Sequence, residues 1–182
     1  MAFLRRVLPV VALLGAGHRL AAQGVRASEY QVKAVFLFNF AQFVDWPAEA
    51  FPAPDTPLVI CVLGNDPFGD ALDQTVRDER LGGRPLQVQR YHSVDEIKTC
   101  HILFINRSEG ARPEEILAGL KQRPILTVSD ADGFAQRGGM IRFVTDRNRI
   151  RLQLNLAATQ AAHLTISSKL LRVAEIVTRN GS

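Results

Sequence analysis

This sequence of 182 residues contains few cysteines and histidines and lacks the common catalytic motifs. It has no HExxH or GxSxG motif, and no two histidines lie close together. Zinc hydrolases and serine hydrolases with a nucleophile elbow use these patterns, so the sequence supports neither class. We expect no catalytic residue, no bound metal and no cofactor, and therefore a binding or regulatory protein rather than an enzyme.

Long apolar runs are also scarce, and the one that stands out lies at the N-terminus. Two arginines and no acid precede the run Val7–Gly17, which a histidine and an arginine then end. A membrane span needs about twenty apolar residues, so an uncleaved anchor is the weaker alternative. The pattern is typical of a secretory signal peptide that can be cut after Ala22 or Ala27. We predict that residues 1–27 are a cleaved signal peptide and that the mature protein works in the bacterial periplasm.

Excess positive charge is missing once this segment is removed. The chain has 22 Lys and Arg against 18 Asp and Glu, and four arginines but no acid precede Ser28. The part from Ser28 onward therefore has 18 residues of each sign and no net charge. A nucleic-acid partner, or adhesion to anionic lipid, consequently has no electrostatic support.

Two cysteines, Cys61 and Cys100, remain in the mature part. In an oxidising compartment such a pair is expected to form a disulfide, with two buried thiols as the alternative. A metal site is not expected, because neither a CxxC pair nor a nearby histidine pattern is present. The disulfide would close a loop of about 39 residues and stabilise the fold by roughly 4 kcal/mol in the chain-entropy model.

The apolar pattern predicts strands that alternate with helices. Continuous apolar runs over Pro57–Leu63, His101–Ile105 and Ile125–Val128 are typical of strands that are buried on both faces. The pattern also predicts a strand nearer the edge, a hairpin and five helices, with these bounds: strand Arg84–Tyr91; hairpin Met140–Val144 and Ile150–Leu154; helices Ser28–Trp46, Leu72–Val76, Ser93–Lys98, Pro113–Leu120 and Leu156–Thr178.

Strands separated by helices favour a parallel sheet with helices on both faces. We predict a single three-layer α/β domain over residues 28–179. Its mostly parallel sheet would resemble the flavodoxin or Rossmann arrangement, with a C-terminal antiparallel hairpin and N- and C-terminal helices. In the 2-1-3 strand order of such folds, the strands with Cys61 and Cys100 are neighbours.

Two turns at the ends of predicted strands are the candidate ligand site, because open α/β sheets bind ligands there. The turn Gly64–Gly69 matches neither GxGxxG nor GxxxxGK[ST], so a plain turn is the alternative. Acids in such turns also serve as caps. The candidate ligand-binding residues are Gly64, Asp66, Phe68, Ser129, Asp130 and Phe134.

The predicted first helix has an aromatic row. Phe36, Phe40 and Phe43 share one face with Val32 and Val35, which indicates a core-facing side. Phe38 lies off that face and is a candidate for an exposed protein contact, with core packing as the alternative.

Several sequence blocks resemble the YfiR/HmsC-like periplasmic proteins over Ser28 to about Val177. The blocks are Lys33–Phe40, Phe43–Pro47, Leu58–Gly64, Asp66–Gly69, Cys100–Ile105, Leu126–Asp130, Gly133–Phe134, Gly138–Ile141 and Ile166–Leu171.

This resemblance implies an exported α/β domain that dimerises and represses an inner-membrane diguanylate cyclase through the cyclase's periplasmic sensor domain. An outer-membrane lipoprotein can sequester such repressors. Cys61 and Cys100 match a cysteine pair of the family, whereas a second pair found in some relatives near Gly138 is missing. Candidate partner-binding residues, on the first and last predicted helices, are Phe38, Ser167, Lys169 and Arg172. A small-ligand sensor that acts on another membrane signalling protein is the alternative function.

Overall fold

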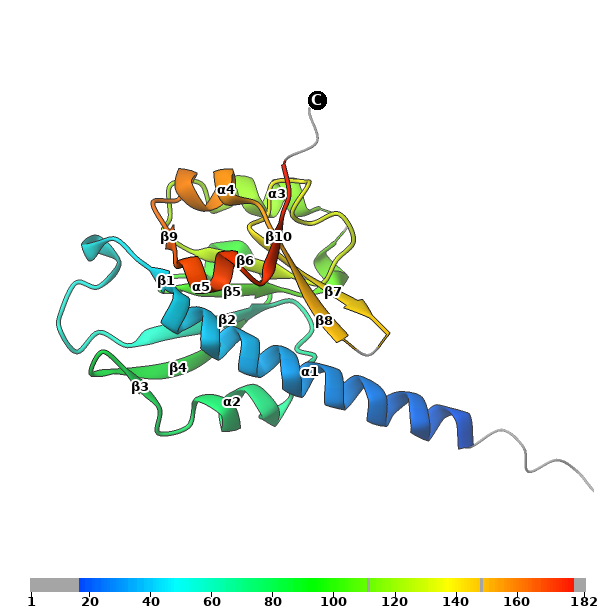
Figure 1. Ribbon diagram of the computed structural model, residues 1–182. Helices are drawn as coiled ribbons and strands as arrows, with labels where there is room; N and C mark the ends of the chain where they lie inside the picture. Colours follow the sequence, from blue (N-terminus) through cyan, green and yellow to red (C-terminus); the bar gives the residue numbers. More distant parts are fainter. Residues whose placement is uncertain (1–16, 111, 148, 179–182) are drawn as a thin grey trace, which may run out of the picture.

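The computed structural model describes residues 17–110, 112–147 and 149–178 of the chain (Figure 1). Its helices are α1 (Gly17–Phe43), α2 (Asp70–Val76), α3 (Pro113–Gly119), α4 (Leu156–Ala161) and α5 (Ser168–Leu171), with short 3-10 turns η1 (Ala48–Ala50), η2 (Val94–Glu96) and η3 (Arg107–Glu109). Its strands are β1 (Val44–Asp45), β2 (Leu58–Leu63), β3 (Arg80–Leu81), β4 (Arg84–Tyr91), β5 (Ile102–Ile105), β6 (Leu126–Ser129), β7 (Ile141–Asp146), β8 (Arg149–Leu154), β9 (Thr165–Ile166) and β10 (Ala174–Ile176).

An eight-stranded sheet in the described part of the chain has the order β10-β8-β7-β6-β5-β2-β4-β3. Strands β4, β2, β5, β6 and β7 pair in parallel, which is the flavodoxin-like order 2-1-3-4-5. Strands β7 and β8 pair in antiparallel fashion as the predicted hairpin. The predicted mostly parallel α/β sheet is therefore confirmed.

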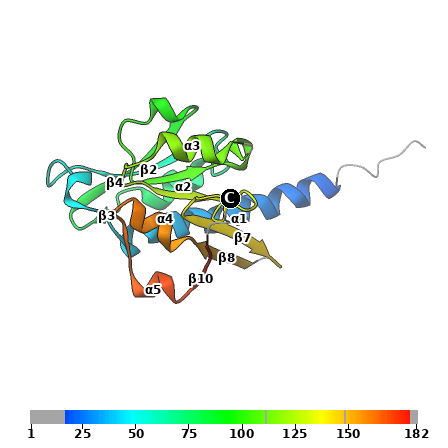
Figure 2. The ribbon, with the colours of Figure 1, turned by 90° about the horizontal axis from the view of Figure 1, so that it is seen from above.

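Helices cover both faces of this sheet, as the two views show (Figures 1 and 2). On one face, Leu37 and Phe40 of α1 pack with Ile60 and Phe104 of the sheet. On the other face, Ile116 of α3 belongs to a second core with neighbouring residues of β2 and β5. Successive residues of β2 and β5 point to opposite faces, so strands buried on both sides read as continuous apolar runs.

Helix α1 differs from the prediction in its start and in its buried face. It begins at Gly17 rather than Ser28, and its first turns extend away from the sheet (Figure 1). Val32 and Val35, expected in the core, are 46% and 48% exposed, whereas Lys33 and Ala34 are fully buried. The helix is rotated in this way because Lys33 makes buried ion pairs.

The predicted long helix over Leu156–Thr178 is wrong. Helix α4 ends at Ala161, His163 two residues later has φ of 58°, and the Leu164 N–H donates to the Thr159 carbonyl at 3.0 Å. This is a Schellman termination, and it turns the chain into β9. Strand β9 pairs with β1, and β10 then pairs with β8 at the sheet edge. These strands satisfy backbone groups that a continuous helix would have satisfied internally.

Cys61 and Cys100 form a disulfide, as expected, with Cα atoms 6.1 Å apart. Both residues lie in the second core. The strand partners of β2, which contains Cys61, are β4 and β5, so the predicted adjacency of the strands next to Cys61 and Cys100 is confirmed.

Candidate functional site

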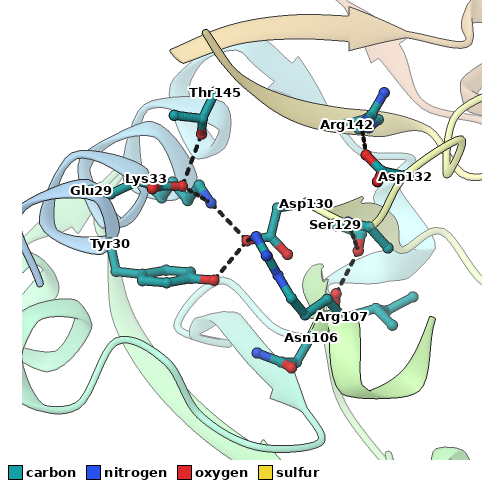
Figure 3. Close-up of polar contacts among 12 residues, drawn as sticks. Glu29, Tyr30, Lys33, Asn106, Arg107, Ser129, Asp130, Asp132, Arg142 and Thr145 are labelled. Carbon is teal, nitrogen blue, oxygen red and sulfur yellow. Dashed lines mark hydrogen bonds and ion pairs between the residues drawn. The ribbon is translucent and has the colours of Figure 1, made fainter. Parts of the chain in front are cut away.

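The buried carboxylate of Asp130 follows β6 and is the centre of a group of charged and polar side chains (Figure 3). Its Oδ2 accepts hydrogen bonds from Lys33 Nζ at 2.7 Å, the Tyr30 hydroxyl at 2.7 Å and Arg107 Nη2 at 3.1 Å. Lys33 Nζ also lies 2.6 Å from Oε1 of Glu29. We call Glu29, Tyr30, Lys33, Arg107 and Asp130 the ion cluster.

The ion cluster joins segments that are far apart in the sequence. Three members belong to α1, where the i,i+4 spacing of Glu29 and Lys33 places both side chains on one face. Arg107 comes from η3 after β5, and Asp130 from the loop after β6. Thr145 of β7 donates a hydrogen bond to Glu29 Oε1 at 2.8 Å. The cluster therefore fastens α1 to the carboxyl ends of β5 and β6 and to β7.

Burial makes this network energetically sensitive. The side chains of Lys33 and Asp130 are 0% and 2% exposed. A buried charge is tolerated only when it is paired and hydrogen-bonded. Lys33 meets this requirement with two carboxylates and with the ring of Tyr30, whose centroid is 4.4 Å from Nζ. Removing one partner would leave another charge buried without compensation.

Hydrogen bonding keeps the acids of the ion cluster ionised. Burial opposes ionisation of Asp130, but hydrogen bonds from Arg107 and Lys33 outweigh it and lower the pKa of this carboxyl. Burial likewise opposes ionisation of Glu29, and bonds from Lys33 and Thr145 leave its pKa lowered. Burial, and then the bond to Asp130, raise the pKa of Tyr30, so its hydroxyl remains a donor.

A polar cavity of about 620 Å³ adjoins the ion cluster. Glu29, Arg107 and Asp130 line it, together with Arg142 and Thr145 of β7. The cavity lies at the carboxyl ends of β5 and β6, which is the position where open α/β sheets bind ligands. We call this space the polar cavity.

The predicted turn Gly64–Gly69 lies away from the polar cavity. Gly64 has φ of 85°, and a Cβ there would lie 2.9 Å from side-chain atoms of Ser108 and Glu109. Side chains of Ser108 and Glu109 therefore lie close against the end of β2 at Gly64. Asp66 accepts from the Phe68 backbone N–H at 2.7 Å and pairs with Arg90.

Most of the other predicted ligand residues have structural contacts. Phe68 is buried and packs edge-on against Tyr30 and Phe104. Ser129 donates to the Ile105 carbonyl at 2.7 Å. Phe134 is buried in the second core. Of the six predicted ligand residues, Asp130 is the one that lines the polar cavity.

The predicted partner-binding residues lie on or beside α1 and α5. Phe38 is half-buried and packs against the core between α1 and the sheet, which includes Leu37 and Phe40. Ser167 caps α5, since its side chain accepts from the Leu170 N–H. Two of the four predicted residues, Lys169 and Arg172, are exposed.

Sequence reasoning missed most of the charged residues around Asp130. Glu29, Lys33 and Arg107 were not identified as candidates, nor was Arg142. A signal was present in α1, because the pair Glu29 and Lys33 has ion-pair spacing within an otherwise apolar segment. The partner across the fold, Asp130, follows Lys33 by 97 residues, and such long-range pairing has no local signal.

Together, the fold and the site define a small three-layer α/β domain with a charged cavity at the carboxyl ends of its strands. Within the residues that the structure describes, no group of three or more His, Cys, Asp or Glu side chains is placed to hold a metal ion. The chain belongs to the YfiR/HmsC-like family, whose model matches residues 30–175. Comparison with curated proteins gave no match.

Family membership confirms the resemblance seen in the sequence. The family is regulatory and non-catalytic, and membership points to a periplasmic regulator of cyclic-di-GMP signalling with a membrane signalling partner. Among the described helices, none is both long and apolar enough to cross a membrane.

Proposed function

We propose that this protein represses an inner-membrane diguanylate cyclase by binding the periplasmic sensor domain of that enzyme. Repression would lower cyclic-di-GMP and biofilm formation. The family match over residues 30–175 carries this proposal, because it covers nearly all of the chain after the predicted signal peptide. Homodimer formation and sequestration by an outer-membrane lipoprotein are part of the same proposal, and they rest on the family resemblance.

The proposed mechanism is a shift in the cyclase's conformational equilibrium. A protein that binds the inactive conformation more tightly than the active one moves the population toward the inactive state. A shift from 1:99 to 99:1 needs about 5.5 kcal/mol of differential affinity. Protein–protein contact of ordinary quality can provide this, so the mechanism needs no catalytic group on the repressor.

The exposed apolar side chains support a contact surface around α1, α5 and β10. Val32 and Val35 on α1 are about half exposed, and Val173 and Ile176 beside α5 are 66% and 50% exposed. Helices α1 and α5 are in contact, and α5 leads directly into the edge strand β10. We propose that the membrane partner binds here, with Phe38, Ser167, Lys169 and Arg172 in or beside the contact.

Export requires removal of the N-terminal segment, and we predict cleavage before Ser28, or less favourably before Gln23. Cleavage before Ser28 would keep Glu29, Tyr30 and Lys33, so the ion cluster would remain complete. Ser28 would then cap the start of the helix. N-terminal sequencing of the exported protein should give Ser-Glu-Tyr-Gln. Mature material that retains Met1 would contradict the periplasmic proposal.

Deleting the gene is expected to raise cellular cyclic-di-GMP and biofilm formation. Charge reversal of the exposed pair, Lys169→Glu with Arg172→Glu, should have the same effect while secretion and folding stay normal. A loss of 1.4 kcal/mol in binding would weaken the complex about tenfold. The measurement is cyclic-di-GMP in strains that carry each variant together with the cyclase.

The matched control is Lys121→Glu, an exposed position after α3 on the opposite side of the sheet. This variant should repress normally. Unchanged cyclic-di-GMP in the deletion strain, with the cyclase present, would overturn the repressor proposal. Repression that survives the double charge reversal would instead move the contact surface away from α5.

A further inference from the structure

We propose that the polar cavity binds a small anion, either a carboxylate or a phosphate ester, through Arg107 and Arg142. The inference goes beyond the proposed function and does not depend on it. It concerns direct binding by the isolated mature protein, whereas the proposed function concerns a membrane partner.

The shape of the sheet creates the polar cavity. Strand β7 pairs with the last residues of β6 only, through Ile141 with Val128 and Arg142 with Ser129. The rest of β7 therefore extends beyond the carboxyl end of β6 and forms a wall. A volume of about 620 Å³ is within the range of sites that hold small molecules.

Three arginines line the polar cavity, and they differ in how far they are already occupied. Arg137 is bound to both oxygens of Glu114 and to the Gly110 carbonyl. Among the described residues, Arg107 makes one ion pair, with Asp130, and its side chain is 61% exposed. Arg107 therefore retains N–H donors for a ligand.

Arg142 is held in place but incompletely paired. Its Nη2 donates to Asp132, and its Nη1 donates to Gln153 Oε1 at 3.3 Å. Its Nε is buried and has no hydrogen-bond partner among the described residues. Because the Asp132 side chain is fully exposed, its ion pair with Arg142 is screened by solvent and weak. An entering anion can replace this carboxylate at little cost.

Asp130 provides an unpaired acceptor at the same cavity. Its Oδ2 has three donors, whereas Oδ1 is buried and has no partner within the part of the chain that is described. A buried polar atom without a partner is costly. A hydroxyl or amine beside the anionic group of the ligand would supply the donor that Oδ1 lacks. The ligand is therefore best described as a small anion with a neighbouring donor.

The charge distribution favours an anion over a cation. Lys33 is fully buried between Glu29 and Asp130, at 2.6 Å and 2.7 Å, and Arg107 pairs with Asp130 at 3.1 Å, so the two acids already face two cations of the protein. A cationic ligand would have to compete with both of them. An anion has only to attract the exposed Arg107 and to exchange with the exposed Asp132.

Calorimetric titration of the mature protein tests the proposal with three probes at matched ionic strength. L-malate provides a carboxylate with a hydroxyl, glycerol 3-phosphate provides a phosphate ester, and glycerol is the uncharged control. We expect saturable binding of at least one anion and none of glycerol. Arg107→Gln and Arg142→Gln should each weaken binding about tenfold or more, which is 1.4 kcal/mol. Arg151→Gln, an exposed arginine that pairs with Asp146 outside the cavity, should not.

Each result of these titrations either supports or overturns anion binding in the polar cavity. Binding of malate alone assigns a carboxylate ligand, and binding of glycerol 3-phosphate alone assigns a phosphate ester. No saturable heat with either anion at millimolar concentration overturns the proposal, as does equal binding of glycerol. An affinity that neither arginine substitution changes also overturns it. If Arg142→Gln does not fold, Arg107→Gln decides alone, because that side chain is mostly exposed.

Discussion

Replacing Lys33 with methionine is expected to lower the free energy of unfolding by about 3 kcal/mol, since breaking a buried ion pair typically costs 3–5 kcal/mol. Methionine keeps the length of the side chain but leaves Glu29 and Asp130 without their shared cation. Arg107 and Tyr30 still contact Asp130, so the loss should lie at the lower end of that range. The corresponding fall in melting temperature is roughly 6–12 °C for a domain of this size. Urea titration of the mature protein measures the change.

The matched control is Lys98→Met at an exposed position, where a change below about 0.5 kcal/mol is expected. The double variant Lys33→Met with Asp130→Asn should lose less than the two single variants together, because removing both charges leaves neither unpaired. A loss below about 1 kcal/mol for Lys33→Met would show that the ion cluster does not hold α1 to the sheet.

The stability that the Asp130 carboxylate gives the folded protein should depend on pH. The pKa of Asp130 is lowered in the folded state, so the folded protein binds fewer protons than the unfolded chain at mildly acidic pH. The stabilisation is present above the unfolded value of about 3.9 and is lost as the pH falls through the folded value. The stability gap between the unmodified protein and Asp130→Asn should therefore close in strong acid.

The central strands could be predicted from sequence because their signal is local. Leu58–Leu63 and Ile102–Ile105 are buried on both faces and read as unbroken apolar runs. The hairpin of β7 and β8 was equally clear from its alternation. From these runs and the helices between them, the parallel sheet and the neighbouring positions of the two cysteines follow.

The C-terminal part could not be predicted, because its structure depends on partners elsewhere in the fold. Residues of β9 extend because Val44 and Asp45 of β1 pair with them. Residues of β10 extend because they continue the sheet beside β8. The apolar spacing of this segment is compatible with a helix, and no glycine or asparagine marks the left-handed position at His163 where the chain turns away.

The sequence predicted a ligand site in two turns at the carboxyl edge of the sheet, and one of these turns contributes Asp130 to the polar cavity. The other turn begins at Gly64, where the side chains of Ser108 and Glu109 lie close to the end of β2. The polar cavity lies instead between the ends of β5 and β6 and the projecting part of β7. Its position depends on the offset of β7 relative to β6, which no local pattern encodes.

Removing the disulfide by Cys61→Ala with Cys100→Ala is expected to lower the free energy of unfolding by about 4 kcal/mol, because the bond closes a long loop in the unfolded chain. The domain should still fold, since a chain of about 150 residues buries a substantial core of its own. Urea titration should also show a steeper transition, because the unfolded chain without the bond exposes more surface.

The bond is expected to act on the unfolded state rather than on the native site. Around it, the His101 N–H donates to the Val59 carbonyl at 2.9 Å, and His101 Nδ1 accepts from the Val59 N–H at 3.1 Å. These contacts hold β2 against the start of β5 without the sulfur atoms. The ion cluster lies at the opposite end of β5.

Reduction with a phosphine should therefore lower the stability of the unmodified protein to that of the double alanine variant. It should leave the variant's own stability unchanged and preserve anion binding in both proteins. Two free thiols in the untreated exported protein, measured with a thiol reagent, would contradict the bond itself, and a stability difference below about 1 kcal/mol would contradict the loop-closure account.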